Sequence, residues 1–335
     1  MIDLFSDTHT LPTDAMRRAM ADAEVGDEQL GEDPTTNRLQ ERVAELFGKE
    51  AALFLPSGSM CNKVGVAVFT RPGDTVVCDH QAHVLRFEGG GATVVAGVAF
   101  EPLHTEDGHF GPEQVEAVMS PGSVYSSRTS LVTLENTHNL AGGTVWPVDR
   151  YEAVCAVAHD HGAKVHVDGA RLLNAVATSG VPATRWAAPA DTIWLDFSKG
   201  LGAPAGAAIA GSQAVIEEAT RFKYLLGGAM RQSGMLTSAA LHALDHHVDR
   251  LADDHANAAR LGEGLRDLGV DVTPPESNMV YFDPSPKGLS SEAFVSALDG
   301  VRMSIVAGRV RAVTHLGVTG DDIEVAISAS ARVLG

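Results

Sequence analysis

The sequence has few cysteines, no long hydrophobic run and a deficit of basic residues. Its three cysteines, Cys61, Cys78 and Cys155, are far apart and odd in number, which argues against a disulfide framework and against a cysteine-ligated metal. No apolar run is long enough to cross a membrane. Lysine and arginine number 25 against 43 acidic residues, and the formal charge of −18 disfavours binding to nucleic acids or anionic membranes.

The first residues also lack the basic stretch and apolar stretch that together mark an export signal. We therefore expect a cytoplasmic protein with reduced thiols, and neither nucleic acid nor membrane among its partners. With 335 residues, of which 44% are hydrophobic, the chain can bury a large core and is long enough for two domains.

Short apolar or β-branched runs alternate with helical periodicity from about residue 35 to residue 211. This alternation predicts an α/β fold, in which helices cover a mostly parallel sheet of about seven strands. Several runs are apolar without interruption, as strands buried on both faces require. The predicted strands span residues 51–56, 75–79, 92–99, 130–135, 163–168, 192–197 and 205–210.

The longest helical pattern, residues 234–268, leads into a carboxyl-terminal segment with strands predicted at 279–282 and 310–314. We therefore predict an N-terminal arm and large domain over residues 1–247, and a smaller α+β domain over residues 248–335. The sequence shows no internal repeat and no low-complexity linker between them.

A lysine and an aspartate carry the strongest chemical signal. Asp168 ends an apolar run, and Lys199 follows at a spacing that fits one helix and a neighbouring strand. Both side chains would then lie at the carboxyl edge of the sheet, where ligands of α/β folds bind. A desolvated lysine can condense with an aldehyde, and an aspartate can keep a pyridine nitrogen protonated. The pair indicates pyridoxal 5′-phosphate (PLP), while a surface lysine and a helix-capping aspartate are the ordinary alternative.

The turn Ser57-Gly58-Ser59 joins a predicted strand to a helical pattern that begins at Met60. Free backbone N–H groups and two hydroxyls at a helix start suit a phosphate group, and a simple N-cap is the alternative interpretation. The turn lacks the lysine of a Walker A loop and the spacing of a dinucleotide fingerprint, so a nucleotide is not specifically indicated.

Three arginines and one histidine are further candidates. Arg171 comes one short turn after the aspartate and can bind a carboxylate through two N–H groups. Arg231 lies in a glycine-rich loop, and Arg311 lies on a predicted strand. His83 follows a strand and can stack on an aromatic cofactor or act as a base near neutral pH. The ordinary alternatives are solvated surface charges and a loop histidine bonded to backbone.

A metal site is not predicted. His242 and His246 lie four residues apart on one helical face, with Asp249 and Asp253 nearby. The segment lacks the glutamate of a zinc-protease motif, and it is rich in surface charge. We therefore interpret this pair as part of a solvated helix face.

Short motifs in a fixed order along nearly the whole chain resemble the L-threonine aldolase family of PLP enzymes, part of the aspartate-aminotransferase-like, fold-type I group. So many matches in order make the resemblance specific. The motifs are Ser6-Asp7-Thr8, Gly31-Glu32-Asp33-Pro34-Thr35, Pro56-Ser57-Gly58-Ser59, Phe87-Glu88-Gly89-Gly90, Leu134-Glu135-Asn136-Thr137-His138-Asn139, His166-Val167-Asp168-Gly169-Ala170-Arg171, Ser198-Lys199-Gly200-Leu201-Gly202-Ala203-Pro204 and Met230-Arg231-Gln232-Ser233-Gly234.

The resemblance implies a role for each candidate. Lys199 would form the Schiff base with PLP, Asp168 would pair with the pyridine nitrogen, and His83 would stack on the ring. The other implied cofactor contacts come from Gly58, Ser59, Arg171 and Arg231. The implied contacts to the substrate carboxylate come from Ser6, Arg171 and Arg311. Binding the carboxylate selects the reaction, because only a bond perpendicular to the ring can release its electrons into it.

By the same resemblance, the protein cleaves an L-β-hydroxy-α-amino acid of the L-threonine or L-allo-threonine type to glycine and an aldehyde. Family members are homodimers or homotetramers with active sites at subunit interfaces, so an isolated monomer is expected to be inactive. The candidate catalytic residues are Lys199, His83 and Tyr125.

Four positions depart from the family pattern. Phe5 stands where relatives usually carry arginine, Leu30 where tyrosine is frequent, and Tyr224 where lysine is common. Tyr125 occupies a position that is commonly histidine, and a phenol is a poorer base than an imidazole at neutral pH. We therefore expect the change at Tyr125 to alter the preference between the two Cβ configurations. His83, Tyr125 and an ordered water all stay open as the catalytic base.

Two other functions fit the same residues. A PLP-dependent β-eliminating lyase would act on serine-like or cysteine-like substrates and would yield pyruvate and ammonia. The departures from the family pattern at Leu30, Tyr125 and Tyr224 favour this function if they reflect a different reaction. A PLP-binding protein without turnover is the second alternative, and the retained amine, ring anchor and carboxylate-binding arginines argue against it.

Overall fold

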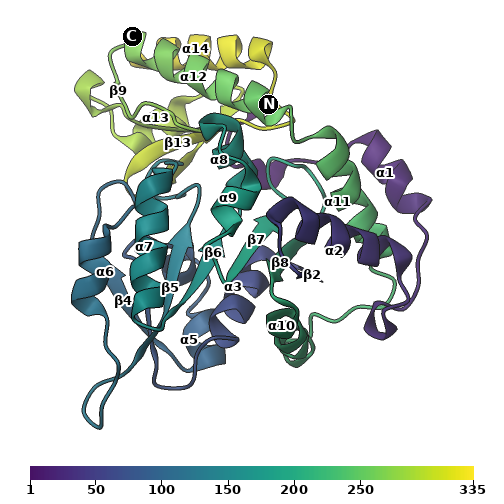
Figure 1. Ribbon diagram of the computed structural model, residues 1–335. Coiled ribbons are helices and arrows are strands. Elements are labelled where there is room, and N and C mark those ends of the chain that lie inside the picture. The colour runs from purple at the N-terminus through teal and green to yellow at the C-terminus, as the bar shows by residue number, and fades with distance from the viewer.

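The computed structural model describes residues 1–335 and contains a seven-stranded sheet at its centre (Figure 1). The strands are β2 (Ala51–Leu55), β3 (Thr75–Asp79), β4 (Ala99–Leu103), β5 (Thr129–Glu135), β6 (Lys164–Asp168), β7 (Thr192–Asp196) and β8 (Ala207–Gly211). Their order is β2-β8-β7-β6-β5-β3-β4, in which only β8 is antiparallel to its neighbours. The predicted α/β class with a mostly parallel sheet is therefore confirmed.

Helices cover both faces of this sheet. They are α1 (Asp14–Ala21), α2 (Pro34–Phe47), α3 (Gly58–Ala67), α4 (His83–Arg86), α5 (Gly91–Ala96), α6 (Pro112–Val118), α7 (Val148–Asp160), α8 (Leu172–Ser179), α9 (Ala183–Ala187), α10 (Gln213–Leu225) and α11 (Gly234–His246). The apolar side chains of α3, α5 and α10 pack on one face, and those of α2, α7, α9 and α11 pack on the other. Strands β5, β7 and β8 are buried at every position, which explains why apolar, β-branched or small residues fill them up to the acidic residues that end β5 and β7.

Two predictions of local structure are wrong. Residues 92–99 mostly form helix α5, because Gly90 and Gly97 adopt left-handed conformations that delimit a short helix. The strand in this region is β4, at the edge of the sheet, where mostly exposed side chains give no apolar signal. The pattern over residues 234–268 is two helices, since a break separates α11 from α12 (Leu251–Asp267).

The carboxyl-terminal part forms a second, antiparallel sheet in the order β12-β13-β10-β9. Its elements are β9 (Asp271–Val272), β10 (Met279–Asp283), α13 (Ser291–Ala297), β12 (Ser304–Val306), β13 (Arg309–Val313) and α14 (Gly320–Leu334). The first strand of the chain, β1 (Ile2–Asp3), pairs with β11 (Val301–Arg302), and Leu4 enters the core of this smaller unit. The domain boundary near residue 247 stays a prediction. None of the helices combines the length and the apolar character that crossing a membrane requires.

Polar side chains collect at the carboxyl edge of the large sheet. Strand β3 ends at Asp79, β5 at Glu135, β6 at Asp168 and β7 at Asp196. Glu135 and Asp168 are direct partners in the strand register. Strand β2 runs in the same direction as β7, because both are antiparallel to β8, so its end at Leu55 reaches this edge too. This edge is where a ligand of an α/β fold binds.

Candidate active site

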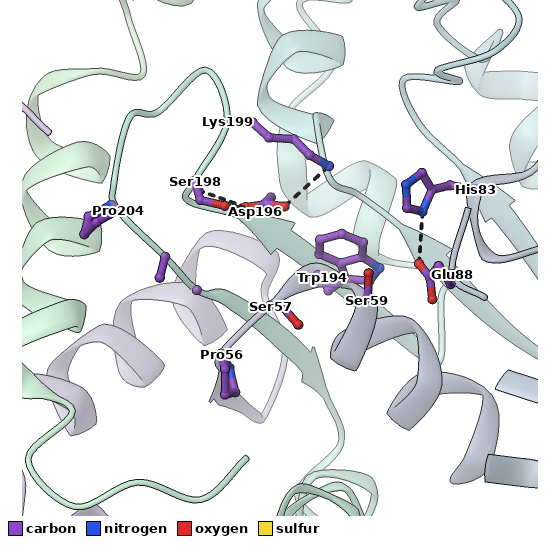
Figure 2. A pocket seen from close by; sticks show the side chains of 13 residues that line it. Pro56, Ser57, Ser59, His83, Glu88, Trp194, Asp196, Ser198, Lys199 and Pro204 are labelled. Carbon is purple, nitrogen blue, oxygen red and sulfur yellow. Dashed lines mark hydrogen bonds and ion pairs between the residues drawn. The ribbon is translucent and has the colours of Figure 1, made fainter. Parts of the chain in front are cut away.

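A cavity of about 390 Å³ lies at this edge, between the start of α3 and the loop that follows β7 (Figure 2). Lys199 lines it from that loop, with Nζ 3.4 Å from Oδ2 of Asp196. The ring of Trp194 also lines the cavity, and its centroid is 5.7 Å from Nζ of Lys199. Only 15% of the Lys199 side chain is exposed. Such an enclosed amine is suited to condensation with an aldehyde.

The start of α3 forms another wall of the same cavity. The side chain of Ser57 caps the helix by accepting from the N–H of Met60. Helix geometry leaves the backbone N–H groups of Gly58 and Ser59 without acceptors inside the helix. A Cβ atom on Gly58 would overlap the ring of Trp194, so only glycine allows this close approach. The predicted phosphate-binding turn therefore faces the cavity that holds Lys199.

Asp168 lies beside a second carboxylate and a histidine. One ligand atom from each of His83, Glu88 and Asp168 lies within 4.8 Å of the other two. Asn62 links the two buried carboxylates, since its Nδ2 donates to Oε1 of Glu88 at 2.7 Å and to Oδ2 of Asp168 at 2.8 Å. The two carboxylates provide anions for a protonated ring nitrogen.

His83 is held from two sides. Its backbone N–H donates to Oε2 of Glu135 at 2.7 Å, and its ring Nδ1 lies 3.0 Å from Oε1 of Glu88. Burial alone would lower the pKa of His83, but the hydrogen bond to Glu88 and the charges of Asp168, Glu135 and Glu88 outweigh burial and raise the pKa. One face of the ring remains accessible, because 33% of the side chain is exposed.

A second cavity, of about 360 Å³, shares His83 and Lys199 with the first. It contains all three residues predicted to bind the substrate carboxylate, namely Ser6, Arg171 and Arg311. The structure thus brings these residues together from the N-terminal segment, the end of β6 and strand β13. Its apolar walls are Phe87 and Val306.

Arg171 is already engaged by a residue that the sequence did not single out. Its Nε and Nη2 donate to the two carboxylate oxygens of Asp7 at 2.7 and 2.6 Å. Burial alone would raise the pKa of Asp7, but the charge of Arg171 outweighs burial and holds the pKa well below its usual range. Nη1 of Arg171 forms no hydrogen bond to protein, which leaves it available to a ligand in the cavity.

Three predicted site residues line neither cavity: Asp168, which is buried beside His83 and Glu88, and the exposed Arg231 and Tyr125. Arg231 pairs with Asp27 at 2.7 Å, and 60% of its side chain is exposed. Tyr125 is 97% exposed, in the loop before β5. The Arg231 and Tyr125 side chains line neither the cavity around Lys199 nor the one around Arg311, so the roles predicted for them stay predictions.

The other departures from the family pattern also avoid the two cavities. Leu30 and Tyr224 are 70% and 47% exposed, and the Tyr224 hydroxyl donates to the carbonyl of Gln29. Phe5 stacks on His9, with the ring centroids 5.0 Å apart, and its carbonyl accepts from Nη2 of Arg311. The Phe5 backbone thus supports Arg311, while its side chain packs on His9 and lines neither cavity.

Several site residues were missed from the sequence. They are Asp7, Asn62, Glu88, Glu135, Asn139, Trp194 and Asp196. Four of them, Asp7, Glu88, Glu135 and Asn139, stand inside the motifs that carry the family resemblance, and Asp196 ends an apolar strand. A signal was therefore present, but a sequence does not show which of several adjacent polar side chains faces a ligand.

His242 and His246 lie close together on α11, as their spacing predicts. Their ring centroids lie 4.4 Å apart on α11, and the ring of His247 lies 5.4 Å from that of His242. No carboxylate completes a group of three ligand atoms there. Burial, with some repulsion from the two neighbouring histidines, lowers the pKa of His242.

The residues fit PLP. The cavity offers an enclosed amine and a turn of free N–H groups, and the buried carboxylate of Asp168 lies beside His83 and Glu88, which line the cavity. Oε2 of Glu88 is buried without a hydrogen-bond partner, so it is available to accept from a bound group. Together with the sheet, these features define a PLP-dependent enzyme of the aspartate-aminotransferase-like class.

Comparison with known proteins agrees with this class. A family model described as beta-eliminating lyase matches residues 3–285. Low-specificity L-threonine aldolase 1 of Arabidopsis thaliana is 41% identical over 338 residues, which cover 98% of this chain and 94% of the relative. The threonine aldolase structure from Leishmania major has a TM-score of 0.85 at 20% identity, with 100% of both chains covered. The aspartate aminotransferase of Thermus thermophilus has a TM-score of 0.74 at 19% identity, with 99% and 91% covered.

The chain therefore belongs to the beta-eliminating lyase family and has the aspartate-aminotransferase-like fold. It is a PLP-dependent lyase. The predicted fold class, cofactor and enzyme class are confirmed.

Proposed function

We propose that the protein cleaves L-β-hydroxy-α-amino acids of the threonine type into glycine and an aldehyde. The observation that carries this proposal is the pair of adjoining cavities, one around Lys199 and one around Arg171 and Arg311, with both lined by His83. The 41% identity to a low-specificity L-threonine aldolase over nearly the whole chain supports the same activity.

One set of residues would hold the cofactor, and another set would hold the substrate. Lys199 would hold the aldehyde carbon of PLP, Asp168 its ring nitrogen, and the turn at Gly58 and Ser59 its phosphate. When bound, PLP serves as an electron sink for a bond at the carbon that carries the substrate amine. Which bond breaks is decided by orientation.

Orientation comes from the carboxylate-binding residues. Nη1 of Arg171 is free to donate to a substrate carboxylate, because Asp7 holds the other two nitrogens of the guanidinium. Arg311 is fixed by Ser304, Asn139 and the carbonyl of Phe5. Two anchored cations can hold a carboxylate in one plane, which turns the Cα–Cβ bond toward the orientation that cleavage needs.

His83 is the proposed acceptor of the β-hydroxyl proton, at Nε2. It lines both cavities, so it can reach the substrate while it stacks on the cofactor. Burial opposes protonation of the ring, but the neighbouring carboxylates raise the pKa of His83 and so make it a stronger base near neutral pH.

A homo-oligomer with sites at subunit interfaces completes this proposal. Lys199 is the only lysine that lines the cavity beside the phosphate-binding turn, and no arginine lines it. A bound phosphate dianion favours a further cation. Arg231 and Tyr125 are exposed in the single chain, so a second copy can receive both residues.

The test is a product assay on the PLP-loaded protein. L-threonine, L-allo-threonine, phenylserine and L-serine would each be supplied, and glycine, aldehyde and pyruvate would be measured. We expect glycine and the matching aldehyde from the β-hydroxy amino acids, and no turnover by Lys199→Ala. Pyruvate from serine without glycine would instead establish β-elimination.

A further inference from the structure

Asn62 is fully buried on α3, and its neighbours determine its orientation. Nε1 of Trp194 lies 2.8 Å from Oδ1 of Asn62, and an indole N–H can only donate. Oδ1 is therefore the acceptor, so Nδ2 faces the carboxylates. Nε2 of His166 lies 3.1 Å from the same Oδ1 and donates to it, while burial lowers the pKa of His166 to about 4 and keeps that ring neutral.

This orientation fixes Glu88 as an acceptor from two sides. Its Oε1 accepts a hydrogen bond from Nδ2 of Asn62 at 2.7 Å and lies 3.0 Å from Nδ1 of His83. A carboxylate oxygen accepts, so Nδ1 of His83 carries a proton. Nε2 is then the nitrogen that gains or loses a proton, and it bonds to no protein atom. In Figure 2 the free ring nitrogen faces the side on which Lys199 lies.

The charges around His83 are mainly negative. Glu88 follows α4, Glu135 ends β5 and Asp168 ends β6. The cations that line the shared cavities or lie on α4 are Lys199, Arg171, Arg311 and Arg86. Asp7 already balances Arg171, and Asp196 lies beside Lys199. The Glu88 side chain is 0% exposed and Oε2 has no partner, so its charge is met only by His83 and the amide of Asn62.

We propose that Glu88 is a positioning residue of this site. It holds Nδ1 of His83 as a donor, keeps Nε2 toward the cavity and favours the charged imidazole, while Asn62 fixes Glu88 relative to Asp168. The inference rests on the proposed function, in which Nε2 of His83 meets the substrate hydroxyl. A residue that only filled space would affect neither the tautomer nor the titration of His83.

The first measurement needs no change at Glu88. The PLP-loaded wild type, labelled with ¹⁵N-histidine, would be titrated by NMR, and the His83 signals would be identified as those missing from His83→Asn. We expect the neutral ring to carry its proton on Nδ1. A proton on Nε2 in the neutral form would overturn the proposal, whether or not any Glu88 variant folds.

The second measurement compares Glu88→Gln with Glu101→Gln, which removes one exposed charge from the edge strand β4. We expect the His83 titration and the acid limb of kcat/KM to move down by about one pH unit or more in Glu88→Gln, because an opposite charge at hydrogen-bond distance is lost. Glu88→Asp should restore part of the shift, and Glu101→Gln should show none. An unmoved titration in a folded, PLP-loaded Glu88→Gln would refute the role.

Failure of this inference is distinguishable from failure of the proposed function. If wild type forms glycine but the titration of His83 is the same in wild type and Glu88→Gln, only the inference fails. If wild type binds PLP and forms no glycine, the proposed function fails, and the NMR result still decides which nitrogen of His83 is protonated.

Discussion

At the scale of single residues, the site depends on charges buried in pairs. Asp7 and Arg171 are both buried, and the ion pair joins the N-terminal segment to the end of β6. Asn278 also donates to Asp7, at 3.2 Å, so the pair is linked to the smaller unit as well. Removing one partner of such a pair leaves an uncompensated charge, which costs more than the pair itself contributes.

We expect Asp7→Asn to lower the free energy of unfolding by about 3–5 kcal/mol and to raise the KM for the amino acid, since Arg171 loses its anchor. Urea unfolding and steady-state kinetics would measure the two effects. Glu324→Gln is the matched control, because Glu324 pairs with Arg260 at the surface and should leave both quantities unchanged. An Asp7→Asn protein as stable as wild type would contradict the importance of the pair.

The same pair predicts a pH dependence. Arg171 outweighs burial and depresses the folded-state pKa of Asp7, so the stability that Asp7 contributes is present above its unfolded pKa of about 4 and is lost as the pH falls below it. Unfolding of cofactor-free wild type and Asp7→Asn would be compared from pH 6 down to pH 3. We expect the difference between them to shrink toward low pH, and a constant difference would show that the charge of Asp7 is not its cause.

At the scale of elements, the start of α3 must lie very close to Trp194, whose ring lines the cavity. Gly58 is the first residue of this helix, and a methyl group there would overlap the ring of Trp194. Trp194 in turn donates to Asn62, so displacing the indole would disturb the link to Asp168. The helix start and the ring anchor are thus coupled through one tryptophan.

Gly58→Ala should therefore weaken PLP binding at least tenfold, which corresponds to about 1.4 kcal/mol, and should shift the absorbance of the bound cofactor. Gly320→Ala is the control at the first residue of another helix, α14, where an added methyl meets only an oxygen of Asn257 at 3.7 Å. We expect no loss in that variant. Wild-type PLP affinity in Gly58→Ala, measured by absorbance titration, would show that the turn can widen at no cost.

At the scale of the whole molecule, one chain does not assemble every predicted site residue. Lys199 lies in the cavity, whereas Arg231 lies on the surface. If Arg231 acts on the site of a partner copy, the two residues of one chain serve different sites. This arrangement can be tested genetically, because two inactive variants can then restore each other.

We expect Lys199→Ala and Arg231→Ala to be inactive or weakly active alone, and their mixture to regain activity after co-expression. In a dimer, hybrids would carry one intact site, giving about a quarter of the wild-type activity. The mixture would be compared with the sum of the separate proteins at equal total concentration. No gain above that sum would place Arg231 outside the partner's site.

The sequence predicted those parts of the fold that depend on local burial. Strand β3 was predicted with its observed bounds and β5, β6 and β7 within one residue, because strands buried on both faces are rich in apolar and β-branched residues. The edge strand β4 was missed, since its exposed face carries Glu101 and it includes Pro102, which only an edge position readily accepts. The break between α11 and α12 was also missed, because helical periodicity persists on both sides of it.

The sequence predicted several residues of the candidate site but not the hydrogen bonds that link them. Lys199, His83, Ser6 and Arg311 were all predicted site residues and all line the cavities, while their roles stay predictions. The hydrogen bonds that Asn62 donates and that Glu88 and Glu135 accept could not be predicted, because the partners lie on other strands and helices. A sequence pattern reports the environment of a residue along its own element, and it is silent about which distant side chain completes a hydrogen bond.

By itself, the sequence determined the α/β class, the positions of most strands along the chain and the residue types available for PLP chemistry. All of these depend on local composition and on motifs. Only the tertiary structure decided that Asp7 holds Arg171, that Asn62 joins Glu88 to Asp168, and that Arg231 lies outside the cavity. The physical reason is that hydrogen bonds and ion pairs act over a few ångströms. Only folding brings residues from distant parts of the chain that close.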